Sequence, residues 1–210
     1  MTEAQWIRRV IKPLVFTAAL VPAALLVRGA FTGDLGPNPI ETITRETGVW
    51  ALRLLLVTLT LTPIRRLTGW NAAITFRRLA GLFAFFYACL HFSTYIVLDH
   101  FFDLNAIAKD VLKRPYVTAG FTAFVLLVPL AITSTAAMIR RLGGRRWRLL
   151  HRLVYVSATF GVLHYLWLVK ADLQRPVTYG TILAGLLGIR LWLLFRKRIV
   201  AAMATRARAA

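Results

Sequence analysis

Three of the four histidines in this 210-residue chain, His91, His151 and His164, lie inside or at the edge of strongly apolar stretches. An ionisable side chain is costly to keep inside a membrane-spanning segment, so its presence there indicates a functional role. The single cysteine, Cys89, excludes an intrachain disulfide and any paired-cysteine motif for a metal cluster or covalent haem attachment. Imidazole side chains in such surroundings favour non-covalent binding of haem iron.

The elements that position these histidines are expected to be transmembrane helices. The chain is 58% hydrophobic with a mean hydropathy of +0.64, above the roughly 45–50% apolar content of soluble domains. Its formal net charge is +19, but the 27 Lys and Arg residues fall between apolar runs rather than on one amphipathic surface. Composition therefore predicts a membrane protein and argues against nucleic-acid binding.

A transmembrane helix requires about 20 apolar residues, with a range of about 17–25. We predict an all-α integral membrane protein in which residues 1–210 form a single domain, a bundle of six transmembrane helices. The predicted spans cover approximately residues 10–27, 48–64, 79–98, 116–138, 149–169 and 177–195. The first apolar run imitates a signal peptide but lacks a clean cleavage site, so we interpret it as an uncleaved span.

Charge distribution predicts the orientation of the bundle. Most Lys and Arg residues fall on the side that holds both termini, and Glu3 is the one acidic residue on that side. The excess of positive charge predicts that both termini are cytoplasmic, and it also favours contact with anionic membrane lipid. On the other side, residues 31–47 read as a loop, and residues 101–113 as a short amphipathic helix with apolar positions Phe102, Leu104, Ile107, Val111 and Leu112.

Depth along the predicted helices separates the three histidines. His91 lies 13 residues beyond Arg78 and His164 lies 16 residues beyond Arg148, so at about 1.5 Å per residue both lie roughly 20–24 Å into the membrane. We expect these two to face each other as a pair of haem ligands. His151 precedes His164 by 13 residues and is either an inner haem ligand or a histidine at the membrane boundary.

Other residues could support such a cofactor. Ala88 and Gly161 lie three residues before the paired histidines and leave room for a porphyrin, although small residues also allow close helix packing. Arg53, in the second span, either binds a haem propionate or extends to the membrane boundary. Arg78 lies near the inner position that matches His151 and is a second candidate for a propionate. His100 is expected to be solvated.

Six sequence motifs occur in a fixed order between residues 47 and 170, within a resemblance that covers roughly residues 35–195. They are TGVWALRLLLVTLTLTPIRRL, RRLAGLFAFFYACLH, KRPYVTAG, LAITST, RRWRLLHRLVY and HYLWLVK. In this order they closely resemble the MsrQ family, also called YedZ, the haem-binding membrane subunits of the bacterial protein-methionine-sulfoxide reductase system. That family is related to the ferric reductase-like transmembrane domain.

The resemblance implies a b-type cytochrome of the bacterial inner membrane that is not an enzyme by itself. Such a subunit passes electrons from quinol or a cytosolic flavin reductase to a periplasmic molybdopterin-containing methionine sulfoxide reductase, which repairs oxidised proteins. The haem ligands of the family match His91, His151 and His164, and imply one haem b or two. The family is also associated with FMN, which no residue here locates. In the related oxidases two pairs of histidines bind two stacked haems. This chain differs because it has Arg78 near the position of the fourth histidine.

Two alternatives remain open at the level of sequence. A transmembrane ferric reductase would use the same haem but deliver electrons to chelated iron outside the cell. A small proton-coupled transporter would use His91 and His164 as a proton relay. The sequence contains no GxGxxG fingerprint for a nucleotide, so the electrons are expected to come from a separate donor.

Overall fold

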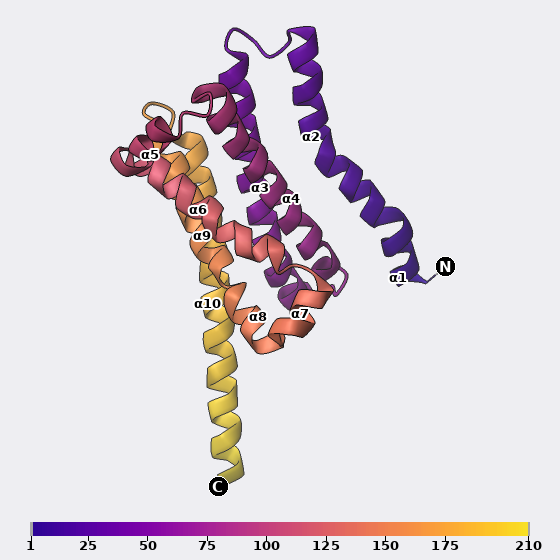
Figure 1. Ribbon diagram of the computed structural model, residues 1–210. Coiled ribbons are helices and arrows are strands. Elements are labelled where there is room, and N and C mark those ends of the chain that lie inside the picture. The colour runs from indigo at the N-terminus through magenta and orange to yellow at the C-terminus, as the bar shows by residue number, and fades with distance from the viewer. Residues whose placement is uncertain (1, 210) are drawn as a thin grey trace.

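The computed structural model describes residues 2–209, and all of the regular secondary structure in that range is helical. The elements in chain order are α1 (Glu3–Trp6), the π-helix η1 (Ile7–Ile11), α2 (Lys12–Thr32), α3 (Pro39–Thr68), α4 (Ala73–Thr94), the π-helix η2 (Tyr95–Asp99), α5 (Leu104–Lys113), α6 (Pro115–Ile132), α7 (Ala136–Leu142), α8 (Gly144–Leu150), α9 (Leu153–Leu168) and α10 (Gln174–Ala209). The long helices run lengthwise through the molecule (Figure 1).

Within the described residues, five helical segments are long and apolar enough to cross a membrane. They are Glu3–Thr32, Pro39–Thr68, Ala73–Asp99, Pro115–Ile132 and Gln174–Arg196. The remaining predicted span corresponds to α9, whose 16 residues extend about 24 Å, less than the ~30 Å hydrocarbon core. The all-helical membrane architecture is therefore confirmed, whereas the count of six spans stays a prediction.

Several predicted boundaries differ from the observed ones. The span predicted at 116–138 ends at Ile132, because the chain turns before Thr135 caps α7. The span predicted at 149–169 begins only at Leu153. Most of the predicted loop at 31–47 is helical, because Asn38 caps α3 by accepting a hydrogen bond from the Glu41 amide, and a proline follows that cap. A capping asparagine followed by proline is a helix start, which outweighs the turn-forming composition.

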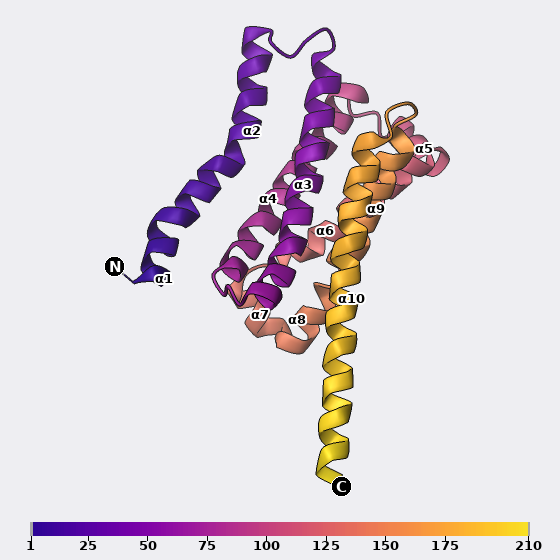
Figure 2. The ribbon, with the colours of Figure 1, turned by 180° about the vertical axis from the view of Figure 1, so that it is seen from behind.

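Two pairs of antiparallel helices form the body of the molecule. α3 packs along α4, and α6 packs along α9, with α10 against α9 and α3 (Figures 1 and 2). Their buried apolar side chains form one continuous core, which includes Leu52, Leu56, Leu59, Val154, Ala158, Val162, Leu183 and Leu186. These contacts hold the helices that carry His91 and His164 in a fixed relation to each other.

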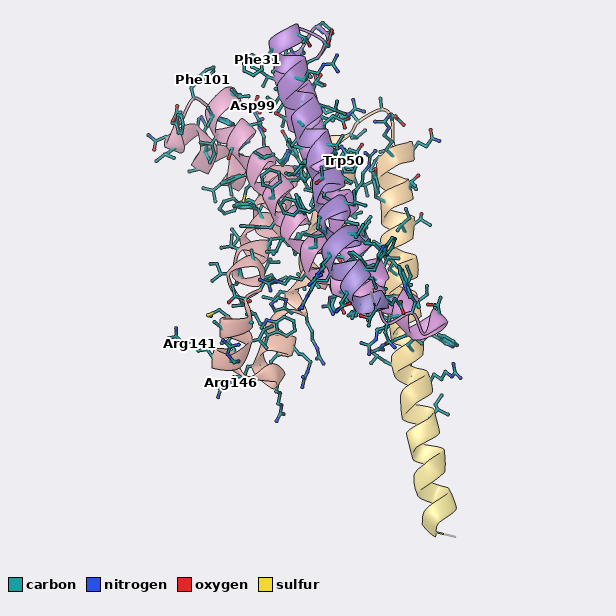
Figure 3. All side chains as sticks on the ribbon, turned by 90° about the vertical axis from the view of Figure 1, so that its right-hand side faces the viewer. Phe31, Trp50, Asp99, Phe101, Arg141 and Arg146 are labelled. Carbon is teal, nitrogen blue, oxygen red and sulfur yellow. The ribbon has the colours of Figure 1, made fainter. Side chains whose placement is uncertain are left out.

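The two ends of the molecule differ in charge. We call the end that holds α7 and α8 the basic end. The end that holds α5 carries all of the acidic residues except Glu3, and we call it the acidic end. Arg141 and Arg146 lie at the basic end, whereas Asp99 lies with Phe31 and Phe101 toward the acidic end (Figure 3). α1 also lies toward the basic end (Figure 1). The charge asymmetry read from the sequence therefore corresponds to two opposite ends of one bundle.

Tyr87 anchors α2, which otherwise diverges from the bundle (Figures 1 and 2). Its buried hydroxyl accepts a hydrogen bond from the Ala23 amide at 3.1 Å and donates one to the Ala19 carbonyl at 2.8 Å. In a regular helix that amide would bond that carbonyl directly. The hydroxyl of α4 is thus inserted into the backbone hydrogen bonds of α2 beside Pro22, an arrangement that kinks helices.

Replacement of Tyr87 by phenylalanine is expected to destabilise the protein by about 1–2 kcal/mol, because one backbone amide and one carbonyl lose their partner. Unfolding of purified protein in mixed micelles measures the change. Tyr95→Phe is the matched control, because within the described residues the buried Tyr95 hydroxyl has no hydrogen-bond partner. Equal destabilisation by both substitutions would contradict the anchoring role of Tyr87.

Candidate functional site

His91 on α4 and His164 on α9 face each other across the bundle. Their ring centres lie 6.0 Å apart, and their ring planes are inclined by 70°. The structure therefore brings together the two histidines that depth counting placed at a similar level. α4 packs mainly on α3, and α9 packs mainly on α6. The His91 ring therefore also contacts α3, and the His164 ring also contacts α6.

Each of these two rings is hydrogen-bonded to a backbone carbonyl of the helix beside it. His91 Nδ1 lies 2.8 Å from the Thr44 carbonyl oxygen on α3, and His164 Nδ1 lies 2.7 Å from the Tyr116 carbonyl oxygen on α6. A carbonyl oxygen can only accept a hydrogen bond, so Nδ1 carries the proton in both rings. Nε2 consequently keeps its lone pair, which is the form of histidine that binds a metal ion.

A glycine makes room for each ring one helical turn after the carbonyl that holds it. A Cβ atom added to Gly48 would lie 3.0 Å from Nδ1 and Cε1 of His91, and one added to Gly120 would lie 2.7 Å from Nδ1 of His164. The same arrangement of carbonyl and glycine thus occurs on α3 and on α6. Neither glycine was predicted from the sequence to contact a histidine, although glycines inside apolar helices signal close approach of another group.

The spacing of the two rings fits a metal ion between them. An imidazole nitrogen lies about 2.0–2.1 Å from a first-row metal ion, and the ring centre lies about 1 Å further away, so two imidazoles on opposite sides have centres roughly 6 Å apart. The observed separation is 6.0 Å. Two imidazoles leave the other coordination positions to a second donor, such as the porphyrin of haem. The donor set therefore fits haem iron.

His151 has a different environment, near the basic end. It follows α8 and precedes α9, and its ring stacks on Trp147 with centres 4.0 Å apart. Its Nε2 lies 3.0 Å from the Thr133 hydroxyl, which donates its own proton to the Pro129 carbonyl. The hydroxyl therefore accepts from His151, and Nε2 carries the proton. The nitrogen that is free in the paired histidines is thus hydrogen-bonded in His151.

Arg53 turns toward α10 in the structure. Its Nε donates to the Tyr179 hydroxyl at 2.9 Å, and its guanidinium carbon lies 4.9 Å from the centre of the Trp50 ring. Arg190, on α10, is held in a similar way: it donates to the Tyr155 hydroxyl and to the Leu59 carbonyl. Aromatic rings and hydroxyls lower the cost of a cation in apolar surroundings. Each arginine therefore joins α10 to a neighbouring helix.

Two adjacent arginines of α4, Arg77 and Arg78, lie near the inner position that was matched to His151. Arg77 is the charged residue that acts electrostatically on His151, whereas Arg78 lines a groove between α2 and α4 together with Arg8 and Lys12. One residue rotates a helix face by about 100°. The two side chains therefore lie on different faces of α4, and contact between Arg78 and a haem propionate stays a prediction.

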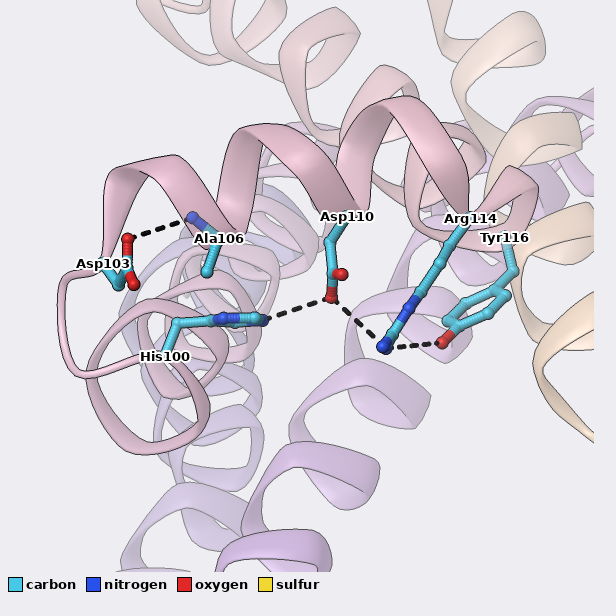
Figure 4. A network of polar contacts seen from close by, with 6 residues as sticks. All are labelled: His100, Asp103, Ala106, Asp110, Arg114 and Tyr116. Carbon is cyan, nitrogen blue, oxygen red and sulfur yellow. Dashed lines mark hydrogen bonds and ion pairs between the residues drawn. The ribbon is translucent and has the colours of Figure 1, made fainter.

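A polar network at the acidic end connects α5 to the start of α6 (Figure 4). Asp110 lies 3.4 Å from His100 Nε2 and 3.2 Å from the Arg114 guanidinium, which also donates to the Tyr116 hydroxyl at 3.3 Å. That hydrogen bond raises the pKa of Arg114, which stays charged. His100 was expected to be solvated, but its side chain is only 17% exposed. Arg114 thus also contacts the side chain of Tyr116, the residue whose backbone carbonyl accepts the hydrogen bond from His164.

Comparison with known proteins defines the class to which this helical bundle belongs. The sequence profile of the family described as ferric reductase like transmembrane component matches residues 47–162, a range that includes His91, Gly120 and His151. Because the match covers more than half of the chain, the protein is a member of the ferric reductase-like transmembrane class.

Relatives that are similar over most of the chain identify the family within this class to which the protein belongs. A protein from Herminiimonas arsenicoxydans is 56% identical over 90% of this chain and 87% of its own. Proteins from Rhodospirillum rubrum and Ralstonia nicotianae are 53% and 50% identical, covering 88% and 90% of this chain and 88% of each relative. All three are named protein-methionine-sulfoxide reductase heme-binding subunit MsrQ. The chain belongs to the MsrQ family, which confirms the resemblance seen in its motifs.

Proposed function

We propose that this protein is the haem-binding electron-transfer subunit of a methionine sulfoxide reductase system, with a haem b between His91 and His164. The observation that carries the proposal is the paired geometry: both Nδ1 atoms donate to backbone carbonyls, and the ring centres lie 6.0 Å apart. A haem bound there supplies reversible one-electron chemistry. The names of the relatives support the same cofactor.

The chain's own residues would orient and tune this site. The carbonyls of Thr44 and Tyr116 fix the tautomer of each histidine and raise the basicity of the ligating nitrogen. Gly48 and Gly120 let each ring lie against the neighbouring helix. Leu52 of α3 is buried and packs beside Gly161, three residues before His164. Apolar side chains of this kind exclude water, which influences the reduction potential of a bound haem.

The direction of electron transfer follows from charge and depth. We place the basic end in the cytoplasm because Lys and Arg are retained there, with α9 as the fifth of six spans in the bacterial inner membrane. The carbonyls that hold the paired histidines lie near the starts of α3 and α6, on the side that then faces the periplasm. This supports a periplasmic molybdopterin-containing reductase as acceptor, and quinol or a cytosolic flavin reductase as donor.

A second haem at His151 has less support from the geometry than the haem at the paired site. No residue of the sequence locates the FMN that is associated with the family. Iron binding through Nε2 of His151 would require loss of its hydrogen bond to Thr133. Arg77 lies near His151 and would be the nearby cation for a propionate there. Arg53 would bind a propionate of the haem between His91 and His164 only if its hydrogen bond to Tyr179 changed. Iron binding through Nε2 at the paired site would leave both Nδ1 hydrogen bonds in place, whereas iron binding through Nε2 of His151 would break one hydrogen bond.

The function is tested by the reoxidation of reduced protein. Chemically reduced, purified protein is expected to lose its reduced haem spectrum under anaerobic conditions only when the periplasmic reductase and methionine sulfoxide are both present. Reoxidation by a ferric chelate without that reductase would instead support a transmembrane ferric reductase. A purified protein without haem would contradict both electron-transfer functions and favour proton transport.

A further inference from the structure

A groove lies between α2 and α4, on the basic side of the Tyr87 contact. Its volume is about 520 Å³. Three cations, Arg8, Lys12 and Arg78, line it together with the apolar side chains of Phe16, Leu79 and Leu82. The groove arises because Tyr87 holds α2 at Ala19 and Ala23, while the start of α2 diverges from the bundle (Figures 1 and 2).

The positive charges around this groove favour the binding of an anion. Arg8 and Lys12 are four residues apart on one helical segment, where like charges repel, and Arg78 reaches the same groove from α4. None of the residues that line the groove is acidic. The ion pairs found in the described part of the chain both involve Asp110, at the opposite end of the bundle. Within the described part of the chain these three cations therefore have no acidic partner, and the groove is open to an anion from outside the chain.

The combination of cations and an apolar wall matches one component of the membrane. The groove opens between two helical segments that are long and apolar enough to cross a membrane, and its cations lie toward the basic end, where the proposed orientation puts the cytoplasmic lipid head groups. Phe16 leaves 48% of its surface exposed there. Basic pockets between transmembrane helices bind the phosphate groups of anionic lipids, and an acyl chain covers apolar side chains below them.

We propose that this groove is a binding site for one anionic phospholipid. Its phosphate contacts Arg8, Lys12 and Arg78, and an acyl chain lies along Phe16, Leu79 and Leu82. The lipid joins the start of α2 to α4, as the Tyr87 hydroxyl does nearer the middle of α2. The site does not depend on the proposed haem or on a partner protein.

Counting the phospholipid that remains bound to detergent-washed protein, by native mass spectrometry, tests the site. We expect the parent to retain one phosphatidylglycerol or cardiolipin molecule after passage through mixed-lipid nanodiscs. Arg8→Gln combined with Lys12→Gln should weaken retention about tenfold or more. Arg78→Gln should do the same from the other side of the groove, whereas Arg78→Lys should retain the lipid.

The matched control is Arg9→Gln combined with Arg145→Gln, which removes two charges from the same end of the bundle outside the groove. Thermal unfolding identifies folded preparations for the comparison, independently of haem. Equal lipid loss in the control variant would overturn the proposal, because it would indicate general attraction to a basic surface. Equal retention of zwitterionic phosphatidylcholine, or displacement of the lipid by inorganic phosphate, would overturn it as well.

Discussion

Replacing His91 or His164 with alanine is expected to lower the haem bound at the paired site by more than about tenfold, because each ring supplies one of two ligands. The two single variants should behave alike, since either one leaves a single imidazole facing the site. Haem quantified per protein in purified material, with its optical spectrum, measures the effect. The His91→Ala/His164→Ala double variant should lose no more haem from this site than either single variant.

His100→Ala is the control for this prediction, because His100 pairs with Asp110 at the acidic end. It should keep the parental haem content and spectrum. If His91→Ala and His164→Ala both keep the parental haem content and a two-histidine spectrum, the assignment of the pair is wrong. Loss of about half of the total haem in His151→Ala alone would indicate a second site at His151.

Gly120→Ala is expected to weaken haem binding by about 10–100-fold, the range typical of changes to groups that orient a metal ligand. The added Cβ would lie 2.7 Å from Nδ1 of His164, so the ring must shift and lose its bond to the Tyr116 carbonyl. Gly48→Ala should have a smaller effect of the same kind, because its Cβ would lie 3.0 Å from the ring of His91. Titration of haem into haem-depleted protein measures the affinities.

Gly185→Ala provides the matched control, because a Cβ at that position on α10 meets nothing within 4 Å. It should leave haem affinity unchanged and stabilise the helix by up to about 1 kcal/mol. The role of the glycines would be refuted if Gly120→Ala bound haem as tightly as Gly185→Ala. Loss of affinity in all three variants would likewise show that the effect is not specific to the histidine rings.

Residue counting predicted the pairing of His91 and His164 because helical rise is constant, so equal distances from a basic boundary mean similar depth. It did not predict the groups that hold the rings. The carbonyls of Thr44 and Tyr116 carry no side-chain signal, and they reach the histidines only because α3 packs on α4 and α6 packs on α9. Tertiary packing therefore determines the tautomer of each histidine.

Rotation about the helix axis was harder to predict than depth. Arg78 was placed at the level of His151; the charge of its neighbour Arg77 acts on His151, and a step of one residue changes the helix face by about 100°. The turn at Thr133 was missed because the three hydroxyl residues 133–135 lie between apolar residues, so the apolar stretch was extended through them to residue 138. The contact of Tyr87 with the kink in α2 also depends on packing between distant segments.

The most direct test of paired ligation is the low-temperature EPR spectrum of oxidised His151→Ala protein, in which only His91 and His164 remain as intramembrane histidines. We expect the low-spin ferric signal of a haem with two imidazole ligands, at one spin per haem. A high-spin signal, or a variant that purifies without haem, would contradict coordination of one iron by His91 and His164.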